Sequence, residues 1–300
     1  MTEQGTPAPL AGYRVVCLAL YVPVPAAARR LAALGADVTR VEPPAGDALA
    51  AWCPAWYDEL RVGQRVVRLD LKREADRAEL DELLSDADLL LTAFRPAALA
   101  RLGLAWDPLH ERFPRLCHVV VAGYPAAEEG APGHDLTYQA RAGLLSPPAL
   151  PNTLLADLAG AEQAVSAALA LLLARERGRG AGCARVALAD AAATFAEPLR
   201  HGLTTAGGPL GGGWPAYALY RAEDGWIVVA ALEPHFWSKL LAALGLDPAA
   251  DRRALEAAFL TRSAGEWEAW AAARTLPVVA VRSVVRSPSE DASRPGGGAK

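Results

Sequence analysis

Short apolar runs alternate with stretches of helical periodicity along the first two-thirds of the chain. The runs have the length of buried strands and lie at residues 13–20, 38–41, 66–71, 88–92 and 117–122. Helical patterns lie between them, as in residues 26–34, which Gly35 ends, and in residues 74–84, which carry charges on one face. Because strands that alternate with helices form a parallel sheet covered on both faces, this pattern predicts an α/β fold.

The pattern changes after Asp157. A helical stretch reaches residue 176, and a further strand is expected at residues 184–188. A glycine-rich segment then opens a second unit with strands at 216–220 and 226–231 and helices at 234–244, 249–259 and 263–273. We therefore predict a large domain at residues 1–205, a smaller α+β domain at 206–286 and a disordered tail at 287–300, which is rich in proline, glycine and polar residues.

The composition argues against several classes of protein. The 300 residues include 30 basic and 34 acidic side chains, and a formal charge of −4 is unlike that of a protein held to nucleic acid by bulk charge. The longest central apolar run, residues 164–174, is shorter than the roughly 20 residues that span a bilayer, so we expect a buried helix and no membrane partner. Since the first residues lack the pattern of a secretory signal, we expect a cytoplasmic location.

The motifs of several large enzyme classes are missing. The turn after the first strand, residues 21–25, contains no glycine, so the Gly-x-Gly-x-x-Gly dinucleotide fingerprint is absent there, and no Walker-type loop occurs. The sequence also lacks a Gly-x-Ser-x-Gly elbow. The cysteine and histidine positions do not have the spacing of a metal site or a disulfide framework. We therefore expect no nicotinamide, ATP, serine-hydrolase or metal chemistry.

Several short segments share their order and spacing with one enzyme family. They lie at residues 10–12, 34–44, 69–72, 94–104, 133–140, 152–157, 215–217, 224–225, 231–237 and 276–281. Together they resemble the family III CoA-transferases, most closely the alpha-methylacyl-CoA racemase branch. The resemblance implies a Rossmann-like large domain, a small domain, a homodimer of interlocked chains and an acyl-CoA thioester bound where the domains meet. Coenzyme A then enters as part of the substrate, and no cofactor is permanently bound.

The resemblance also implies a catalytic pair. Racemisation next to a thioester needs two acid/base groups on opposite faces of one carbon, and a histidine and a carboxylic acid suit this because both can be tuned towards pH 7. The family pattern assigns these roles to His134 and Asp157, and it makes Asp157 the carboxylate nucleophile in a transferase. From the residues alone, Asp157 is a helix N-cap and His134 a hydrogen-bonded loop residue. Asp135 is expected to support the histidine or the helix start.

Two further groups complete the expected site. Glu233 precedes a helix that begins at Pro234, where a carboxylate gains from the helix dipole. The racemase resemblance instead places Glu233 across the domain boundary, hydrogen-bonded to the catalytic histidine, and both interpretations stay open. We expect backbone N–H groups, including that of Asp157, to hold the oxyanion of the thioester.

Binding of CoA requires cations for the phosphates and an apolar or cation-stacking wall for the adenine. We place the candidates at strand ends and in the following turns, where open α/β sheets bind ligands: Arg40, Arg65, Phe94, Arg95 and Arg101. Only three of the 30 basic residues are lysine, so each of these arginines can equally be an ordinary surface residue. Arg40 and Arg101 have the best support from the motifs.

The chain departs from the family pattern on the CoA side. Residues 61–64 read Arg-Val-Gly-Gln where members usually have Asn-Arg-Gly-Lys, and Ala93 and Ala97 replace the asparagine and glycine of Asn-Phe-Arg-Pro-Gly. A phosphate-binding lysine and an asparagine are therefore absent at these positions. Three functions stay open: a 2-methylacyl-CoA racemase, which we favour, a CoA-transferase that works through Asp157, and a noncatalytic acyl-CoA-binding relative.

Overall fold

The computed structural model describes residues 8–128 and 130–282. They form two compact units that divide between Glu197 and Pro198. The predicted domain boundary at residue 206 falls inside the second unit. The predicted disordered tail, residues 287–300, lies outside the described residues.

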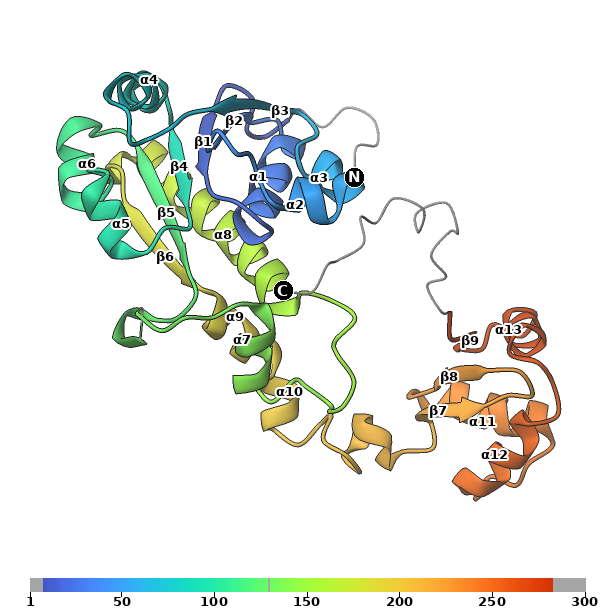
Figure 1. Ribbon diagram of the computed structural model, residues 1–300. Coiled ribbons are helices and arrows are strands. Elements are labelled where there is room, and N and C mark those ends of the chain that lie inside the picture. The colour runs from blue at the N-terminus through green and yellow to red at the C-terminus, as the bar shows by residue number, and fades with distance from the viewer. Residues whose placement is uncertain (1–7, 129, 283–300) are drawn as a thin grey trace, which may run out of the picture. The chain divides into compact units, whose positions relative to one another are not determined.

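The first unit contains a six-stranded parallel sheet (Figure 1). Its strands are β1 (Arg14–Leu18), β2 (Asp37–Glu42), β3 (Gln64–Arg68), β4 (Leu89–Thr92), β5 (Cys117–Ala122) and β6 (Cys183–Ala187). They lie in the order β3-β2-β1-β4-β5-β6. The prediction of an α/β fold with a Rossmann-like parallel sheet is confirmed, and each strand expected in this unit is present within a few residues of its predicted bounds.

Alternate residues of the central strands enter two separate cores. In β1, Val15 and Cys17 belong to one apolar cluster, whereas Val16 and Leu18 belong to the cluster on the opposite face of the sheet. This follows from the strand geometry, in which successive side chains point to opposite faces. Because both faces are covered, β4 is apolar except for Thr92, whereas β2 buries the charged residues Arg40 and Glu42.

Helices cover the two faces as separate sets (Figure 1). The first core includes residues of α1 (Pro23–Ala33), α2 (Leu49–Trp52), α3 (Pro54–Leu60), α7 (Asp135–Arg141), α8 (Leu155–Ala174) and α9 (Leu188–Phe195). The second core includes residues of α4 (Glu74–Ser85), α5 (Pro96–Arg101) and α6 (Trp106–Arg112). Short helical segments at Ala126–Glu128, Arg175–Arg179 and Glu197–Arg200 (α10) lie between these elements.

Helix α8 is the long apolar helix expected after residue 157. With the turn that follows it, residues 155–179, it is the one helix in the described part of the chain that is long and apolar enough to cross a membrane by length and composition. Its small buried residues, among them Ala156, Ala164 and Ala168, pack in the core of the first unit. Leu173 lies on its exposed face. The contacts with α1, β5 and β6 identify α8 as a core helix of this unit.

The second unit is a small α+β domain, as predicted. Its antiparallel sheet consists of β7 (Tyr217–Arg221), β8 (Trp226–Ala230) and β9 (Val278–Ala280), and its helices are α11 (Pro234–Leu244), α12 (Arg252–Phe259) and α13 (Ala264–Ala272). A helical turn at Pro209–Gly213 precedes the sheet. Ile227, Phe259 and Trp267 are central to the core of the unit. The three-residue strand β9 is not among the predicted strands.

Candidate active site

Two cavities open at the carboxyl ends of the strands in the first unit. The larger has a volume of about 520 Å³ and the smaller about 200 Å³, and Leu20, just after β1, lines both. The strand order reverses between β1 and β4, and ligands of open α/β sheets bind at such a reversal because the loops there diverge. Both cavities therefore lie where this fold binds ligands.

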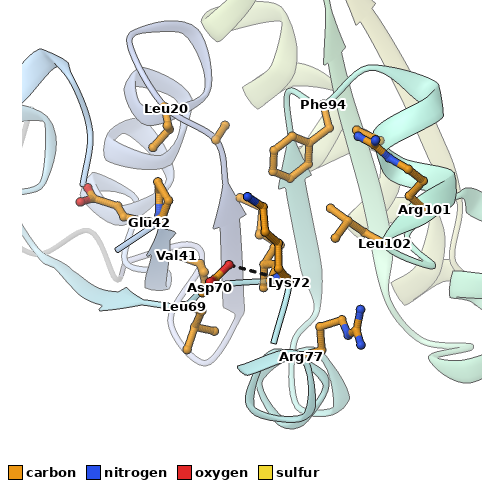
Figure 2. A pocket seen from close by; sticks show the side chains of 15 residues that line it. Leu20, Val41, Glu42, Leu69, Asp70, Lys72, Arg77, Phe94, Arg101 and Leu102 are labelled. Carbon is orange, nitrogen blue, oxygen red and sulfur yellow. Dashed lines mark hydrogen bonds between the residues drawn. The ribbon is translucent and has the colours of Figure 1, made fainter. Parts of the chain in front are cut away.

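The larger cavity combines apolar walls with three cations and two acidic residues, Glu42 and Asp70 (Figure 2). Phe94 and Arg101 line it, as predicted for CoA-binding residues, together with Lys72 and Arg77, which the sequence analysis did not select. The side chains of Lys72, Arg77 and Arg101 have no ion-pair partner among the described residues. Unpaired cations beside an apolar wall suit an anionic ligand that also carries apolar groups.

The smaller pocket brings together the two predicted acid/base residues. His134 and Asp157 both line it, with Arg95, Tyr138 and Tyr21. His134 immediately precedes α7, and Asp157 lies in the first turn of α8. The chain thus brings both groups to the pocket at the starts of helices. Arg95, predicted to bind CoA, lies in this pocket and not with its neighbour Phe94 in the larger cavity.

The protonation of Asp157 is shifted towards neutral pH. Burial, and after it the negative charge of Asp135, raises the pKa of Asp157 to about 7. The carboxyl is then protonated in about half of the molecules at neutral pH, so it can accept or donate a proton. A shift of this kind is typical of catalytic carboxylates.

Asp135 connects the two helix starts. It is buried, with 5% of its surface exposed, and its Oδ1 accepts the backbone N–H of Asp157 at 3.1 Å. Its Oδ2 accepts the side-chain amide of Gln139 at 2.6 Å, and the same amide nitrogen donates to the Thr153 carbonyl at 3.1 Å. Asp135 was expected to support either the histidine or a helix start. In the structure it accepts a backbone N–H in the first turn of α8.

These bonds change one expectation. The N–H of Asp157 was expected to hold the oxyanion, but in the structure it already donates to Asp135. His134 is fixed through its backbone, since its N–H donates to Thr137 Oγ1 at 3.0 Å and the Thr137 hydroxyl donates to the His134 carbonyl at 2.7 Å. The His134 side chain is therefore left to face the pocket.

Tyr138 is a pocket residue that the sequence analysis missed. Burial, and after it the charge of Asp157, raises the pKa of Tyr138 to about 12, so the phenol keeps its proton at neutral pH. Helical spacing from His134 does not single out Tyr138, because His134 precedes α7 in an extended conformation.

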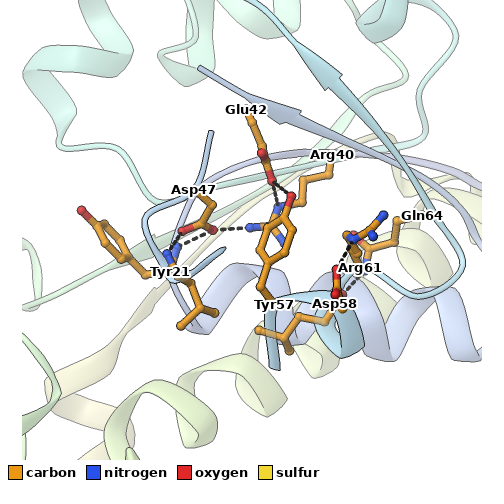
Figure 3. Close-up of polar contacts among 10 residues, drawn as sticks. Tyr21, Arg40, Glu42, Asp47, Tyr57, Asp58, Arg61 and Gln64 are labelled. Atoms are coloured by element: carbon orange, nitrogen blue, oxygen red, sulfur yellow. Dashed lines mark hydrogen bonds and ion pairs between the residues drawn. The ribbon is translucent and has the colours of Figure 1, made fainter. Parts of the chain in front are cut away.

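Arg40 belongs to a buried network and lines neither cavity (Figure 3). Its side chain is fully buried, with Nε 3.1 Å from Glu42 Oε1 and Nη2 bonded to Asp47. The Tyr57 hydroxyl donates to Glu42 at 2.9 Å. The guanidinium thus presents no exposed surface to a phosphate, although its motif support had made it a candidate for binding CoA.

The same network holds the pocket wall. Asp47 Oδ2 accepts the backbone N–H of Tyr21 at 3.0 Å, as Figure 3 shows. Tyr21 has a φ of 69°, a left-handed conformation that favours glycine. Since the turn after β1 contains no glycine, the bond to Asp47, and through it Arg40, stabilises the strained residue at the pocket.

Two other predicted residues lie elsewhere. The expectation that Arg65 falls at a strand end beside CoA is wrong, because it is the second residue of β3. Its side chain bonds Thr39 Oγ1 at 3.3 Å and lines a separate hollow at the starts of β1 and β2. Glu233 is an exposed residue that precedes α11 in the second unit. Its bond to His134 stays a prediction.

The described cysteines form no disulfide, and the described residues contain no metal-binding cluster. Cys17, Cys53, Cys117 and Cys183 are all free. Within residues 8–128 and 130–282, no group of three or more His, Cys, Asp or Glu side chains is placed to hold a metal ion.

Fold and site together define a class of α/β proteins in which a cavity lined by cations and apolar side chains lies beside a small pocket lined by a histidine and a carboxyl. The chain matches the model of CoA-transferase family III over residues 10–292 and belongs to this family. The expected family membership is confirmed.

Similar proteins include both transferases and racemases. A probable fatty acyl-CoA transferase of Mycobacterium tuberculosis is 31% identical over 272 residues, which are 79% of this chain and 69% of the relative. The crystal structure of that protein, Rv3272, has a TM-score of 0.77 and 30% identity, covering 94% of this chain and 87% of that chain. Human alpha-methylacyl-CoA racemase is 32% identical over 79% of this chain and 65% of the relative. A cinnamoyl-CoA:phenyllactate CoA-transferase of Clostridium sporogenes is 35% identical, but over only 44% of this chain and 36% of its own.

The raised pKa of Asp157 predicts a pH-dependent effect on stability. A carboxyl with a raised pKa in the folded state makes the folded protein less stable as pH rises from about 4 to about 7, because the buried group must ionise. Asp157→Asn removes this penalty. We expect the variant to gain roughly 4 kcal/mol in free energy of unfolding at pH 8 and little at pH 4, measured by urea denaturation. The exposed, ion-paired Glu162 on the same helix provides Glu162→Gln as a control without this gain. Equal effects of Asp157→Asn at both pH values would contradict the prediction.

The buried Arg40 network predicts a large loss of stability for Arg40→Ala. The change leaves Glu42 and Asp47 buried without their cation, which typically costs about 3–5 kcal/mol. Arg14→Ala, which breaks the exposed ion pair with Asp86, is expected to cost under about 1 kcal/mol. Urea denaturation of both variants at neutral pH tests this, and similar losses in the two would show that the network does not stabilise the fold.

Proposed function

We propose that this chain exchanges the α-proton of a 2-methyl-branched acyl-CoA, with His134 and Asp157 as the two acid/base groups. The observation that carries the proposal is that both line one small pocket and that Asp157 has a pKa of about 7. A two-base racemase needs one group that accepts a proton and a second that donates one at the same pH. The similarity to human alpha-methylacyl-CoA racemase supports the proposal.

The proposed reaction needs no change in oxidation state. One group removes the α-proton, and the electron pair of the C–H bond moves into the thioester carbonyl to give an enolate. The other group delivers a proton to the opposite face, which restores the carbonyl and inverts the α-carbon. The thioester bond stays intact, so CoA leaves as it arrived, attached to the acyl group.

The larger cavity is the proposed site for CoA. Its cations, Lys72, Arg77 and Arg101, suit the phosphates, and Phe94 with the surrounding leucines suits the apolar parts of the molecule. Leu20 borders both cavities. A ligand held by its phosphates in the larger cavity can therefore extend its thioester past Leu20 into the pocket with Asp157.

Transfer of CoA between carboxylic acids is the second candidate. It is favoured by the transferases among the relatives and by the ionised fraction of Asp157 at neutral pH. The Asp157 carboxylate attacks the thioester carbonyl and the C–S bond breaks. CoA departs as the thiolate, and the acyl group stays on Asp157 as a mixed anhydride. The thiolate then attacks the aspartyl carbonyl and releases the first acid. An acceptor carboxylate then attacks the aspartyl-CoA thioester to form a second mixed anhydride and releases the CoA thiolate. The thiolate attacks the acceptor's carbonyl, so the acceptor leaves as the new thioester and the Asp157 carboxylate is restored.

Other expectations accompany this function as proposals. They are a homodimer, a cytoplasmic location, partners that include neither nucleic acid nor membrane, and CoA as a substrate component without a permanent cofactor. The family relationship is consistent with acyl-CoA as the ligand.

Solvent exchange tests the proposed reaction. The purified protein is incubated in heavy water with one enantiomer of a 2-methylacyl-CoA, and deuterium at the α-carbon and stereochemistry are followed by NMR. We expect exchange with racemisation, and a loss of at least about 10²-fold in His134→Ala and in Asp157→Asn.

A parallel assay with a labelled free acid detects CoA transfer. If exchange is absent while transfer occurs and survives in His134→Ala, the second candidate replaces the first. Saturable CoA binding without either reaction, unchanged in Asp157→Asn, would leave a noncatalytic binding protein.

Removal of one cation tests the CoA site. Arg77 lines the larger cavity without an ion-pair partner among the described residues, so Arg77→Gln is expected to weaken CoA binding roughly tenfold, about 1.4 kcal/mol, in calorimetry. Arg29→Gln makes the same change of charge on α1, away from both proposed cavities, and is expected to leave the affinity unchanged. Equal affinities of the two variants would place CoA elsewhere.

A further inference from the structure

The Tyr138 hydroxyl in the smaller pocket makes no hydrogen bond to another described residue and has no role in the proposed proton exchange. We propose that the Tyr138 hydroxyl donates a hydrogen bond to the thioester oxygen as negative charge develops there. This inference rests on the proposed function, because that function places the acyl thioester in this pocket. It applies equally to racemisation and to CoA transfer, since an enolate and a tetrahedral adduct both carry the charge on the same oxygen.

The position of Tyr138 supports this role. Its side chain lines the pocket with His134 and Asp157, although only 4% of its surface is exposed. Its hydroxyl makes no hydrogen bond to another residue in the described part of the chain. A buried phenol ordinarily finds a partner, so the free donor is available to a ligand that enters the pocket.

The donor is also fixed in place. The ring packs edge-on against Tyr124, with 5.1 Å between the ring centroids. The hydroxyl lies against Gly123, at the end of β5, where a Cβ would collide with it, and the ring lies against Gly133, where a Cβ would also be too close. Preorganised donors stabilise developing charge best because they need no reorientation during the reaction.

Other donors at the pocket are less suited. The N–H of Asp157 already donates to Asp135, and His134 is needed for the proton exchange. Tyr21 stacks on Trp52 but has 43% of its surface exposed, and Arg95 is also an exposed side chain. Because burial keeps the pKa of Tyr138 near 12, the phenol remains a neutral donor. It shares its proton without transferring it, so the proton balance between His134 and Asp157 is unchanged.

Tyr138→Phe tests the inference by removing only the hydroxyl. We expect kcat for exchange, or for transfer, to fall roughly 10²-fold, as is typical for the loss of one oxyanion donor. KM and the affinity for CoA should stay within twofold, and thermal stability should be unchanged, because the hydroxyl makes no hydrogen bond to another described residue. Tyr124→Phe is the matched control, since Tyr124 packs on the same ring without lining the pocket, and it should retain near-normal kcat.

The pH profile separates this role from a positioning role. If Tyr138 acted by holding the Asp157 carboxyl, Tyr138→Phe would shift the acid/base midpoint of kcat. We expect the midpoint to stay in place while the rate falls. A shifted midpoint overturns the inference.

Gly123→Ala provides an independent route to the same hydroxyl. The added methyl group displaces the Tyr138 hydroxyl, so kcat should fall in the single variant but not further when it is combined with Tyr138→Phe. Additive losses, or an active Tyr138→Phe enzyme within twofold of wild type, overturn the inference alone. A wild-type protein that neither exchanges nor transfers acyl-CoA overturns the proposed function and this inference together.

Discussion

Asp135 joins the helix starts that bring His134 and Asp157 to the smaller pocket. Its two carboxylate oxygens accept the N–H of Asp157 and the amide of Gln139, so α7 and α8 must begin side by side for these bonds to form. His134 precedes the first of these helices, and Asp157 lies in the first turn of the second. The same carboxylate contributes to the raised pKa of Asp157. Asp135 therefore connects the starts of the two helices and adds to the effect of burial on the pKa of Asp157.

The effect of Asp135 on Asp157 depends on Asp135 having no cationic partner, as a comparison with the buried Asp47 shows. Asp47 is paired with a fully buried guanidinium, that of Arg40, which compensates its charge. Asp135 instead has the neutral amide of Gln139 as its side-chain partner. Its charge is left to act on Asp157, because a neutral donor satisfies the hydrogen bond without cancelling the charge. The free energy cost of two neighbouring buried carboxyls is thus retained at the site, where it brings the pKa of Asp157 near neutrality.

The sequence was informative where one physical signal dominated. Strands buried on both faces are mostly apolar, so the sheet was predictable, whereas β9 has only three residues, too few for a periodic pattern. The family pattern selected His134 and Asp157, which the structure places in one pocket. The burial of Arg40 was not predicted, because its partner Asp47 comes from a loop beyond the strand. Tyr138 was missed because its role as a pocket residue depends on the space beside Gly123 and Gly133, which only the packing reveals.

The departures from the family pattern take on a different meaning in the structure. Gln64 stands where members have a lysine, yet it is the first residue of β3, and its amide donates to the Leu60 carbonyl at 2.6 Å. It therefore lies at the end of the strand away from the two cavities. The larger cavity instead draws its positive charge from Lys72, Arg77 and Arg101, which follow the carboxyl ends of β3 and β4. Since the charge of a binding site depends on which cations face it and not on one motif position, the loss of that lysine leaves the cavity suited to an anion.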